Sequence, residues 1–219
     1  MTARNGDKSC VGLLMILAYT CLTVLLLVNG CRGGMPGQAI RENDLTEPYE
    51  SVLDRWTREA RVYQDLESKL LIAATYKSLD FRRAYVRKYS RVYGLAPGEE
   101  EVMLAEQTAL AEKNMEFLLA VSGPTQKETD LDTRDSAWRI YLEGDIQDRI
   151  EPFEVYKVKK RTARLEGFFP FISPWDQVYQ VRFIPRSAVP RAGRLNLVLT
   201  GVLGTARLVY HLEDASSSK

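Results

Sequence analysis

Apolar positions between residues 46 and 123 recur at three- and four-residue steps, the spacing of one face of a helix. Thr46 and Pro48 suit the first turn of such a helix. Gly94 is typical of a helix end, and Pro97 before a run of glutamates is typical of a new start. The short link between them indicates two antiparallel helices. The apolar stripe of the first is Val52, Leu53, Trp56, Ala60, Tyr63, Leu66, Leu70 and Ala73, continued after a break or bend at residues 78–80 by Phe81, Ala84, Tyr85, Tyr89 and Val92. The stripe of the second is Met103, Leu110, Met115, Phe117, Leu118 and Val121.

After residue 136 the pattern changes to strict alternation of apolar and polar side chains, which is typical of antiparallel strands. The alternating runs lie at 138–142, 153–159, 179–183, 195–199 and 206–212. Gly201 and Gly204 mark a turn between the last two. Five or six short strands predict a small antiparallel β-sandwich or partly open barrel over residues 136–213. The predicted fold class is therefore α+β, with an N-terminal helical hairpin over residues 45–123 followed by the β domain.

The first residues follow a different pattern. Arg4 and Lys8 precede residues 11–28, which hold no charged side chain, and a small residue, Gly30, stands directly before Cys31. A basic start, an apolar run and a small residue before a cleavage point describe a secretory signal peptide.

The segment Val28-Asn29-Gly30-Cys31 resembles the lipobox of bacterial lipoproteins. The resemblance covers the leader alone, with Asn29 an unusual occupant. It implies that residues 1–30 are removed and that Cys31 is lipidated on its sulfur and then N-acylated. Several acyl chains on one cysteine make anchoring effectively permanent, whereas a single chain holds only reversibly. The alternative is an uncleaved transmembrane anchor, because residues 11–28 reach the lower limit of a membrane span.

Either reading places the remaining chain outside the cytoplasmic membrane, facing the periplasm or the exterior. Residues 31–44 are rich in glycine and predict a flexible tether after the lipidated cysteine. Arg32 follows Cys31, where an aspartate would favour inner-membrane retention in familiar lipoproteins, so the outer membrane is slightly favoured. The last residues, 214–219, are predicted to be disordered.

Charge and cysteine content narrow the classes of function. The chain has 30 Lys and Arg against 29 Asp and Glu, so no basic field indicates a nucleic-acid partner. It has one histidine, His211, which disfavours the usual His-based metal and catalytic sites. Its three cysteines are Cys10, Cys21 and Cys31, so the mature chain holds no internal disulfide. No cofactor, metal or enzymatic motif is expected.

Two segments are candidate contact sites. The aromatic corner between Phe168 and Trp175 also holds Phe169 and Phe171, with prolines at 170 and 174. It is either a rigid hydrophobic surface for a partner or a corner whose rings are buried, and burial is predicted because aromatic rings dominate core energetics. The second segment, residues 82–91, interleaves five cations with tyrosines. It predicts a solvated helix face, with contact to anionic lipid headgroups as the alternative.

The remaining polar candidates are weak. One group lacks the glycine and the final glutamate of a calcium-binding loop and is expected to serve as loop or cap residues: Asp130, Asp132 and Asp135. A second group supplies carboxylates whose separation the sequence does not fix: Glu143, Asp145 and Asp148. His211 is expected at the surface.

Three classes of function follow from these observations. The leading hypothesis is a non-catalytic, membrane-anchored envelope lipoprotein that acts through contacts with an envelope protein partner. The alternative is a binder of a small apolar or lipid ligand, which needs a pocket lined by aromatic side chains. An enzyme is the third, and it needs convergent polar groups with perturbed pKa values.

Overall fold

The computed structural model describes residues 47–144, 149–189 and 193–212. The predicted signal peptide, Cys31 with its tether, and the tail over residues 214–219 lie outside the described residues. Residues from Thr46 onward form one compact unit with a hydrophobic core that runs from Tyr49 to Tyr210. A fragment that begins at Arg32 retains every residue of this core, and we therefore expect it to fold on its own. Within the described ranges, no helix combines the length and the apolar character needed to cross a membrane.

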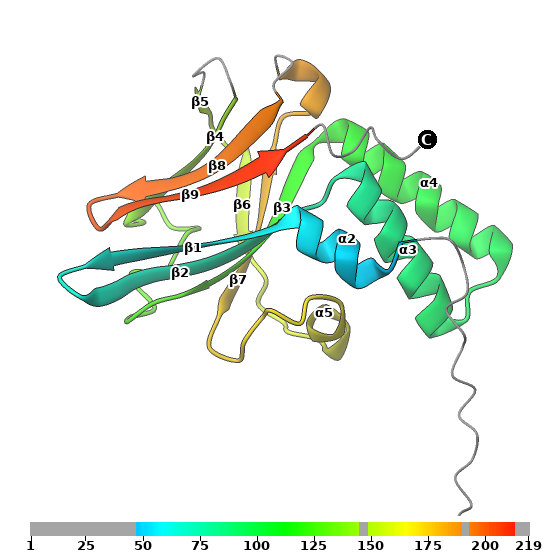
Figure 1. Cartoon of the computed structure of the whole chain (residues 1–219), viewed down its shortest axis with the longest axis horizontal. Helices are drawn as coiled ribbons and strands as arrows, with labels where there is room; N and C mark the ends of the chain where they lie inside the picture. Colours follow the sequence, from blue (N-terminus) through cyan, green and yellow to red (C-terminus); the bar gives the residue numbers. More distant parts are fainter. Residues whose placement is uncertain (1–46, 145–148, 190–192, 213–219) are drawn as a thin grey trace, which may run out of the picture. The chain divides into compact units, whose positions relative to one another are not determined.

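Nine strands among the described residues form two antiparallel sheets (Figure 1). The first sheet has the order β1-β2-β3-β7-β6, and the second has the order β5-β4-β8-β9. The first contains β1 Thr57–Gln64, β2 Glu67–Tyr76, β3 Met115–Ser122, β7 Gln177–Phe183 and β6 Glu154–Lys157. The second contains β5 Arg149–Ile150, β4 Trp138–Glu143, β8 Arg194–Gly201 and β9 Gly204–His211. The helices are α2 Tyr49–Trp56, α3 Leu79–Tyr93, α4 Pro97–Lys113, α5 Ala163–Phe168 and the short 3-10 helix η1 Arg186–Ala188.

The predicted first helix ends much earlier than expected. It stops at Trp56, and residues 57–76 form the β1–β2 hairpin. Asp65 and Leu66 form its turn with φ of 50° and 69°, a geometry that Asn-Gly usually provides. Leu70 and Ile72 alternate into the core, and β2 pairs with β3 along its other edge. The prediction of a continuing helix was wrong because strand pairing and burial on this sheet outweigh the helical spacing.

The link at residues 94–97 does join two helices, α3 and α4, which pack against each other, but each covers only part of the predicted span. Ser78 caps α3 by accepting a hydrogen bond from the Phe81 amide at 3.1 Å. Gly94 ends α3 with a left-handed φ of 65°. The second helix, however, ends at Lys113, and β3 follows in place of its last turns. Residues 115–121 are all buried because β3 lies at the centre of the first sheet.

The alternating runs after residue 136 are confirmed as β4 and β6–β9, and β8 and β9 form the hairpin expected at Gly201 and Gly204. A side chain at Gly201 would place its Cβ 1.9 Å from the Ala137 carbonyl oxygen, so only glycine fits there. These strands divide between both sheets, and β6 and β7 join the sheet of β1–β3. The α+β class is confirmed, but a helical hairpin followed by a distinct β domain is not observed, because strands from both segments share the first sheet.

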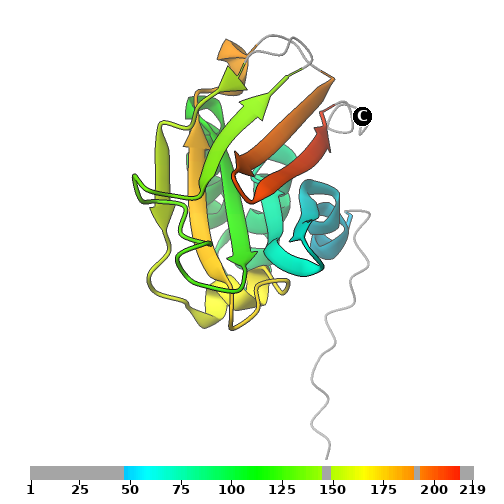
Figure 2. The ribbon, with the colours of Figure 1, turned by 90° about the vertical axis from the view of Figure 1, so that its left-hand side faces the viewer.

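The two faces of the first sheet have different neighbours. Phe117 and Glu116 are adjacent in β3, so their side chains point to opposite faces. The Phe117 face packs on the second sheet, where the rings of Phe117 and Tyr210 lie 5.5 Å apart. The Glu116 face is covered by helix α3, whose Arg82 contacts Glu116. Figure 2 shows helices α3 and α4 behind the strands of the first sheet.

Candidate functional site

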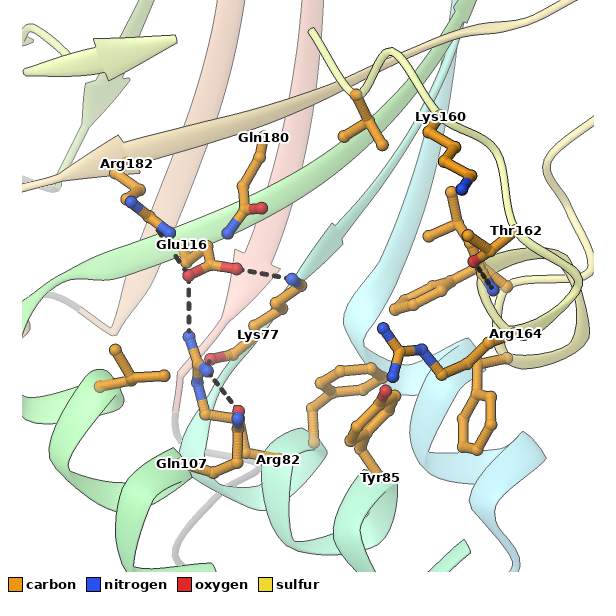
Figure 3. Close-up of a pocket in the computed structure, with 16 residues that line it drawn as sticks. Lys77, Arg82, Tyr85, Gln107, Glu116, Lys160, Thr162, Arg164, Gln180 and Arg182 are labelled. Atoms are coloured by element: carbon orange, nitrogen blue, oxygen red, sulfur yellow. Dashed lines mark hydrogen bonds and ion pairs between the residues drawn. The ribbon is translucent and has the colours of Figure 1, made fainter. Parts of the chain in front are cut away.

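A cavity of about 400 Å³ lies on the Glu116 face, between α3, α4 and the segment 158–169 that contains α5 (Figure 3). Pockets that hold small molecules typically measure about 300–1,000 Å³. The charged side chains that line it are five cations, Lys77, Arg82, Lys160, Arg164 and Arg182, and one carboxylate, Glu116. The cavity therefore has a strong positive excess.

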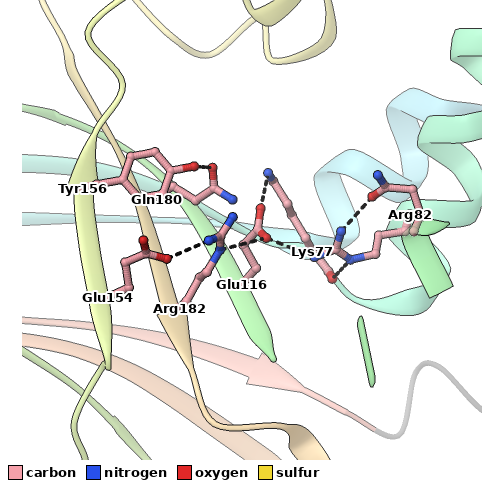
Figure 4. A network of polar contacts seen from close by, with 8 residues as sticks. Lys77, Arg82, Glu116, Glu154, Tyr156, Gln180 and Arg182 are labelled. Carbon is pink, nitrogen blue, oxygen red and sulfur yellow. Dashed lines mark hydrogen bonds and ion pairs between the residues drawn. The ribbon is translucent and has the colours of Figure 1, made fainter. Parts of the chain in front are cut away.

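Glu116 occupies the inner end of the cavity together with three of these cations (Figure 4). Its carboxylate lies 2.5 Å from Lys77 Nζ, 3.4 Å from Arg82 Nη2 and 3.5 Å from Arg182 Nε. The side chains of Glu116 and Arg82 are 4% and 3% exposed. Lys77 follows β2, Arg82 belongs to α3 and Arg182 to β7. Three separate elements thus bring positive charge to one buried carboxylate.

The electrostatics of this cluster favour further negative charge. Burial alone would raise the pKa of Glu116, but the charges of Lys77, Arg82 and Arg182 outweigh it and hold the pKa below its usual range. For Lys77, burial lowers the pKa of the amine, and the two arginines add to this effect against the attraction of Glu116. Glu116 is therefore ionised at neutral pH, and it alone does not balance three cations.

Neighbouring polar groups accept hydrogen bonds from some, but not all, of the donors of Arg82 and Arg182. Arg182 Nη1 donates to Glu154 at 2.6 Å, just outside the cavity. Arg82 donates to Gln107 of α4 at 2.7 Å and to the Lys77 carbonyl at 3.0 Å. The buried Nε of Arg182 has no hydrogen-bond partner among the residues that the structure describes. Its nearest carboxylate is that of Glu116, at 3.5 Å.

Lys160 and Arg164 form the rim of the cavity, where both side chains are exposed. Neither has an ion-pair partner in the described ranges of the chain. Between them, Thr162 starts α5 by accepting a hydrogen bond from the Leu165 amide at 3.2 Å, which fixes the backbone of the rim. Figure 3 shows Arg164 extending toward Tyr85 of α3. The rim therefore presents two cations that are free to meet an incoming anion.

The remaining wall is apolar and largely aromatic. The rings of Tyr85 and Phe168 lie 4.7 Å apart, and those of Phe81 and Phe169 lie 5.8 Å apart. The apolar side chains of the wall are Phe81, Tyr85, Leu110, Val158, Leu165, Phe168 and Phe169. Positive charge beside apolar rings is suited to a ligand with an anionic head and an apolar body.

The aromatic corner predicted from the sequence divides between core and surface. Phe168 and Phe169 are 4% exposed and Phe171 is half-buried, so the predicted burial is confirmed for the first two. Trp175 is 87% exposed, and the prediction that it lies in the core was wrong. The cause is a tight turn in which the Asp176 carboxylate accepts from the Ser173 amide at 2.7 Å and directs Trp175 outward. The role of this corner as a contact surface stays a prediction.

The cations of residues 82–91 in α3 also differ in their surroundings. Arg82 is buried in the Glu116 cluster, contrary to the expected solvated face, because a carboxylate on β3 lies opposite it. Lys88 matches the expectation better, since it pairs with Glu50 at 2.5 Å near the surface. Tyr85 and Tyr89 are half-buried.

The other polar candidates do not converge. Asp130 accepts from the Tyr179 hydroxyl at 3.3 Å and Asp132 from the Lys157 amide at 3.3 Å, so both brace loops. Glu143 pairs with Arg207, whereas Asp145 and Asp148 lie outside the described residues. His211 is exposed, as expected. In the ranges that the structure describes, no group of three or more histidine, cysteine or acidic side chains is placed to hold a metal ion.

Sequence reasoning missed the charged residues of the cavity, although two signals were present. Glu116 is a single carboxylate within the apolar run 115–121, and a lone charge in a buried strand requires partners. Residues 157–164 carry five cations and no carboxylate. Comparison of the chain with protein-family models, curated proteins and solved structures finds no match.

Proposed function

We propose that this protein binds a small amphipathic organic anion in the cavity, with its acidic head among the cations and its apolar body against the aromatic wall. The observation that carries the proposal is the lining itself, in which five cations face a single carboxylate. Buried charge is unfavourable unless it is paired, so an anionic ligand would complete the cluster. No catalytic step is part of the proposal.

A headgroup series tests this proposal. Octyl phosphate, octanoate, octanol and octylamine share one apolar tail and differ in charge. For the fragment that begins at Arg32, we expect the two anions to raise the midpoint of thermal unfolding, because a ligand that binds only the folded state stabilises it. Octanol and octylamine should leave the midpoint unchanged. If octanol stabilises the fragment as much as octanoate, or no anion does, the proposal is wrong.

Two adjacent lysines provide a matched pair of variants. Lys160 lines the cavity, whereas Lys159 is exposed beside it and does not. Lys160→Gln should weaken binding of octyl phosphate about fivefold, the effect of one exposed charge worth about 1 kcal/mol. Lys159→Gln removes the same charge from the protein and should leave this affinity unchanged. Equal losses in both variants would indicate attraction to net charge in place of a defined site.

We further propose that this unit is held outside the cytoplasmic membrane by lipid on Cys31, as the lipobox resemblance implies. Cys31→Ser should then accumulate as an uncleaved precursor that incorporates no labelled fatty acid. Normal cleavage and labelling of this variant would exclude the assignment.

A further inference from the structure

A second surface beside the cavity combines unpaired positive charge with an exposed aromatic ring. Of the five cations in residues 157–164, Lys157 donates to Gln177 at 2.6 Å and Arg161 pairs with Glu166 at 3.1 Å. The other three, Lys159, Lys160 and Arg164, are exposed and have no carboxylate partner within the described parts of the chain.

The exposed ring is that of Trp175. The chain has three tryptophans, and Trp56 and Trp138 are 2% and 3% exposed whereas Trp175 is 87% exposed. A tryptophan in this position leaves a large apolar surface in water, while its indole nitrogen can still contact polar groups. Such rings are enriched where apolar and aqueous phases meet.

One hydrogen bond joins the segment that carries the cations to the segment that carries the ring. Arg161 Nη1 donates to the Ser173 carbonyl at 2.7 Å. Lys159 lies two residues before Arg161, and Trp175 lies two residues after Ser173. Two residues of chain span at most about 7 Å, so Lys159 and Trp175 each lie within about 7 Å of backbone from a residue of this contact. The carboxylate of Asp176 accepts from the Ser173 amide at 2.7 Å, and within the described parts of the chain it forms no ion pair with these three cations.

We propose that Lys159, Lys160, Arg164 and Trp175 form a docking surface for an anionic lipid bilayer. The cations would attract acidic headgroups, and the indole would insert at the headgroup level. A protein partner is less suited, because stable interfaces bury more than about 1,000 Å² and the apolar part of this surface is essentially one ring. Docking would bring the rim of the cavity to the lipid, but it does not require the cavity to hold a ligand.

Tryptophan fluorescence provides a direct test with the fragment that begins at Arg32. Vesicles of phosphatidylcholine mixed with phosphatidylglycerol should shift the emission to shorter wavelength, since only Trp175 starts exposed, and should sediment with the fragment. Vesicles of pure phosphatidylcholine should do neither. Trp175→Ala should abolish the shift and weaken sedimentation about tenfold, through loss of the apolar anchor. Lys159→Gln should weaken sedimentation about fivefold.

The matched control is Phe153→Ala. Phe153 is also exposed, at 61%, but it neighbours Arg182 at the opposite end of β7 from Trp175, so its loss should leave vesicle binding unchanged. The docking surface is overturned if the mixed vesicles do not bind the fragment, or if Trp175→Ala binds them as well as the wild type does. It is also overturned if Trp175→Ala keeps its vesicle binding but no longer binds a protein partner. Neither Trp175 nor Lys159 lines the cavity. Octyl phosphate should therefore still bind both variants, which separates failure of docking from failure of the cavity proposal.

Discussion

The two faces of the first sheet differ, because β3 buries apolar side chains on one face and lines a cavity on the other. On the Phe117 face, the buried Tyr210 hydroxyl donates to the Ala74 carbonyl at 2.7 Å and joins the two sheets. That face is apolar and closed. On the Glu116 face, charged side chains, some buried and some exposed, line a cavity. The first arrangement is complete within the protein, whereas we propose that an added anion completes the second.

The largest expected effect comes from breaking the closed face. Phe117 is fully buried between Tyr76, Phe183 and Tyr210. Phe117→Ala should lower the free energy of unfolding by about 4 kcal/mol, because the removed ring leaves a cavity. Urea unfolding measures this. At temperatures where the variant remains folded, its affinity for octyl phosphate should match that of the wild type, since the ring points away from the site.

Glu116→Gln should act on stability and on binding in opposite directions. The substitution leaves Lys77 and Arg82 without a carboxylate, while Arg182 keeps Glu154, and should lower the free energy of unfolding by about 3 kcal/mol. The same change increases the positive excess of the cavity, so octyl phosphate should bind severalfold more tightly. Urea unfolding and titration calorimetry give the two values. A variant that is both less stable and weaker in binding would show that Glu116 serves the site in another way.

The pH dependence of stability tests whether the ionised carboxylate of Glu116 stabilises the fold. The pKa of Glu116 is lower in the folded protein than its ordinary value of 4.5. The ionised carboxylate therefore contributes fully to the free energy of unfolding above pH 4.5, and this contribution is lost as the pH falls through the folded pKa. The loss is about 1.4 kcal/mol for each unit by which folding lowers the pKa of Glu116. Wild type should lose more stability than Glu116→Gln on acidification through this range. Parallel pH curves for the two proteins would contradict this assignment.

The smallest effect concerns the β1–β2 hairpin, which contributes residues to both faces. Leu66 has a φ of 69° and its side chain is completely exposed. Leu66→Gly should raise the free energy of unfolding by about 0.5–1 kcal/mol, because glycine adopts this φ without strain. Leu66→Ala removes most of the same side chain but retains the strain, so it should give no such gain.

The sequence predicted the α+β class, α3, α4 and the later strands, because caps and alternation are local signals. It did not predict β1–β2, since Asp65-Leu66 lacks the usual turn glycine and the preceding residues also fit a helical stripe. It missed β3 because a continuous apolar run fits a buried helix or strand equally well.

The cavity depended on the same missed pairings. Glu116 meets Lys77, Arg82 and Arg182 only when β2, β3 and β7 are neighbours and α3 covers them. The spacing of apolar and polar residues along the chain does not predict which of these strands pair or which helix covers them. Phe168 and Phe169 were recognised as a distinctive pair, but their contact with α3 required the folded chain.

Titration calorimetry of octyl phosphate into the fragment that begins at Arg32 tests the central claim most directly. One molecule should bind per chain with saturable heat, and octanol should give none. The double variant Lys160→Gln/Arg164→Gln should bind at least tenfold more weakly, since two exposed charges each contribute about 1 kcal/mol. Lys159→Gln should bind as the wild type does. Absence of saturable heat with octyl phosphate, or equal affinity in the double variant and the wild type, would contradict an anion-binding cavity.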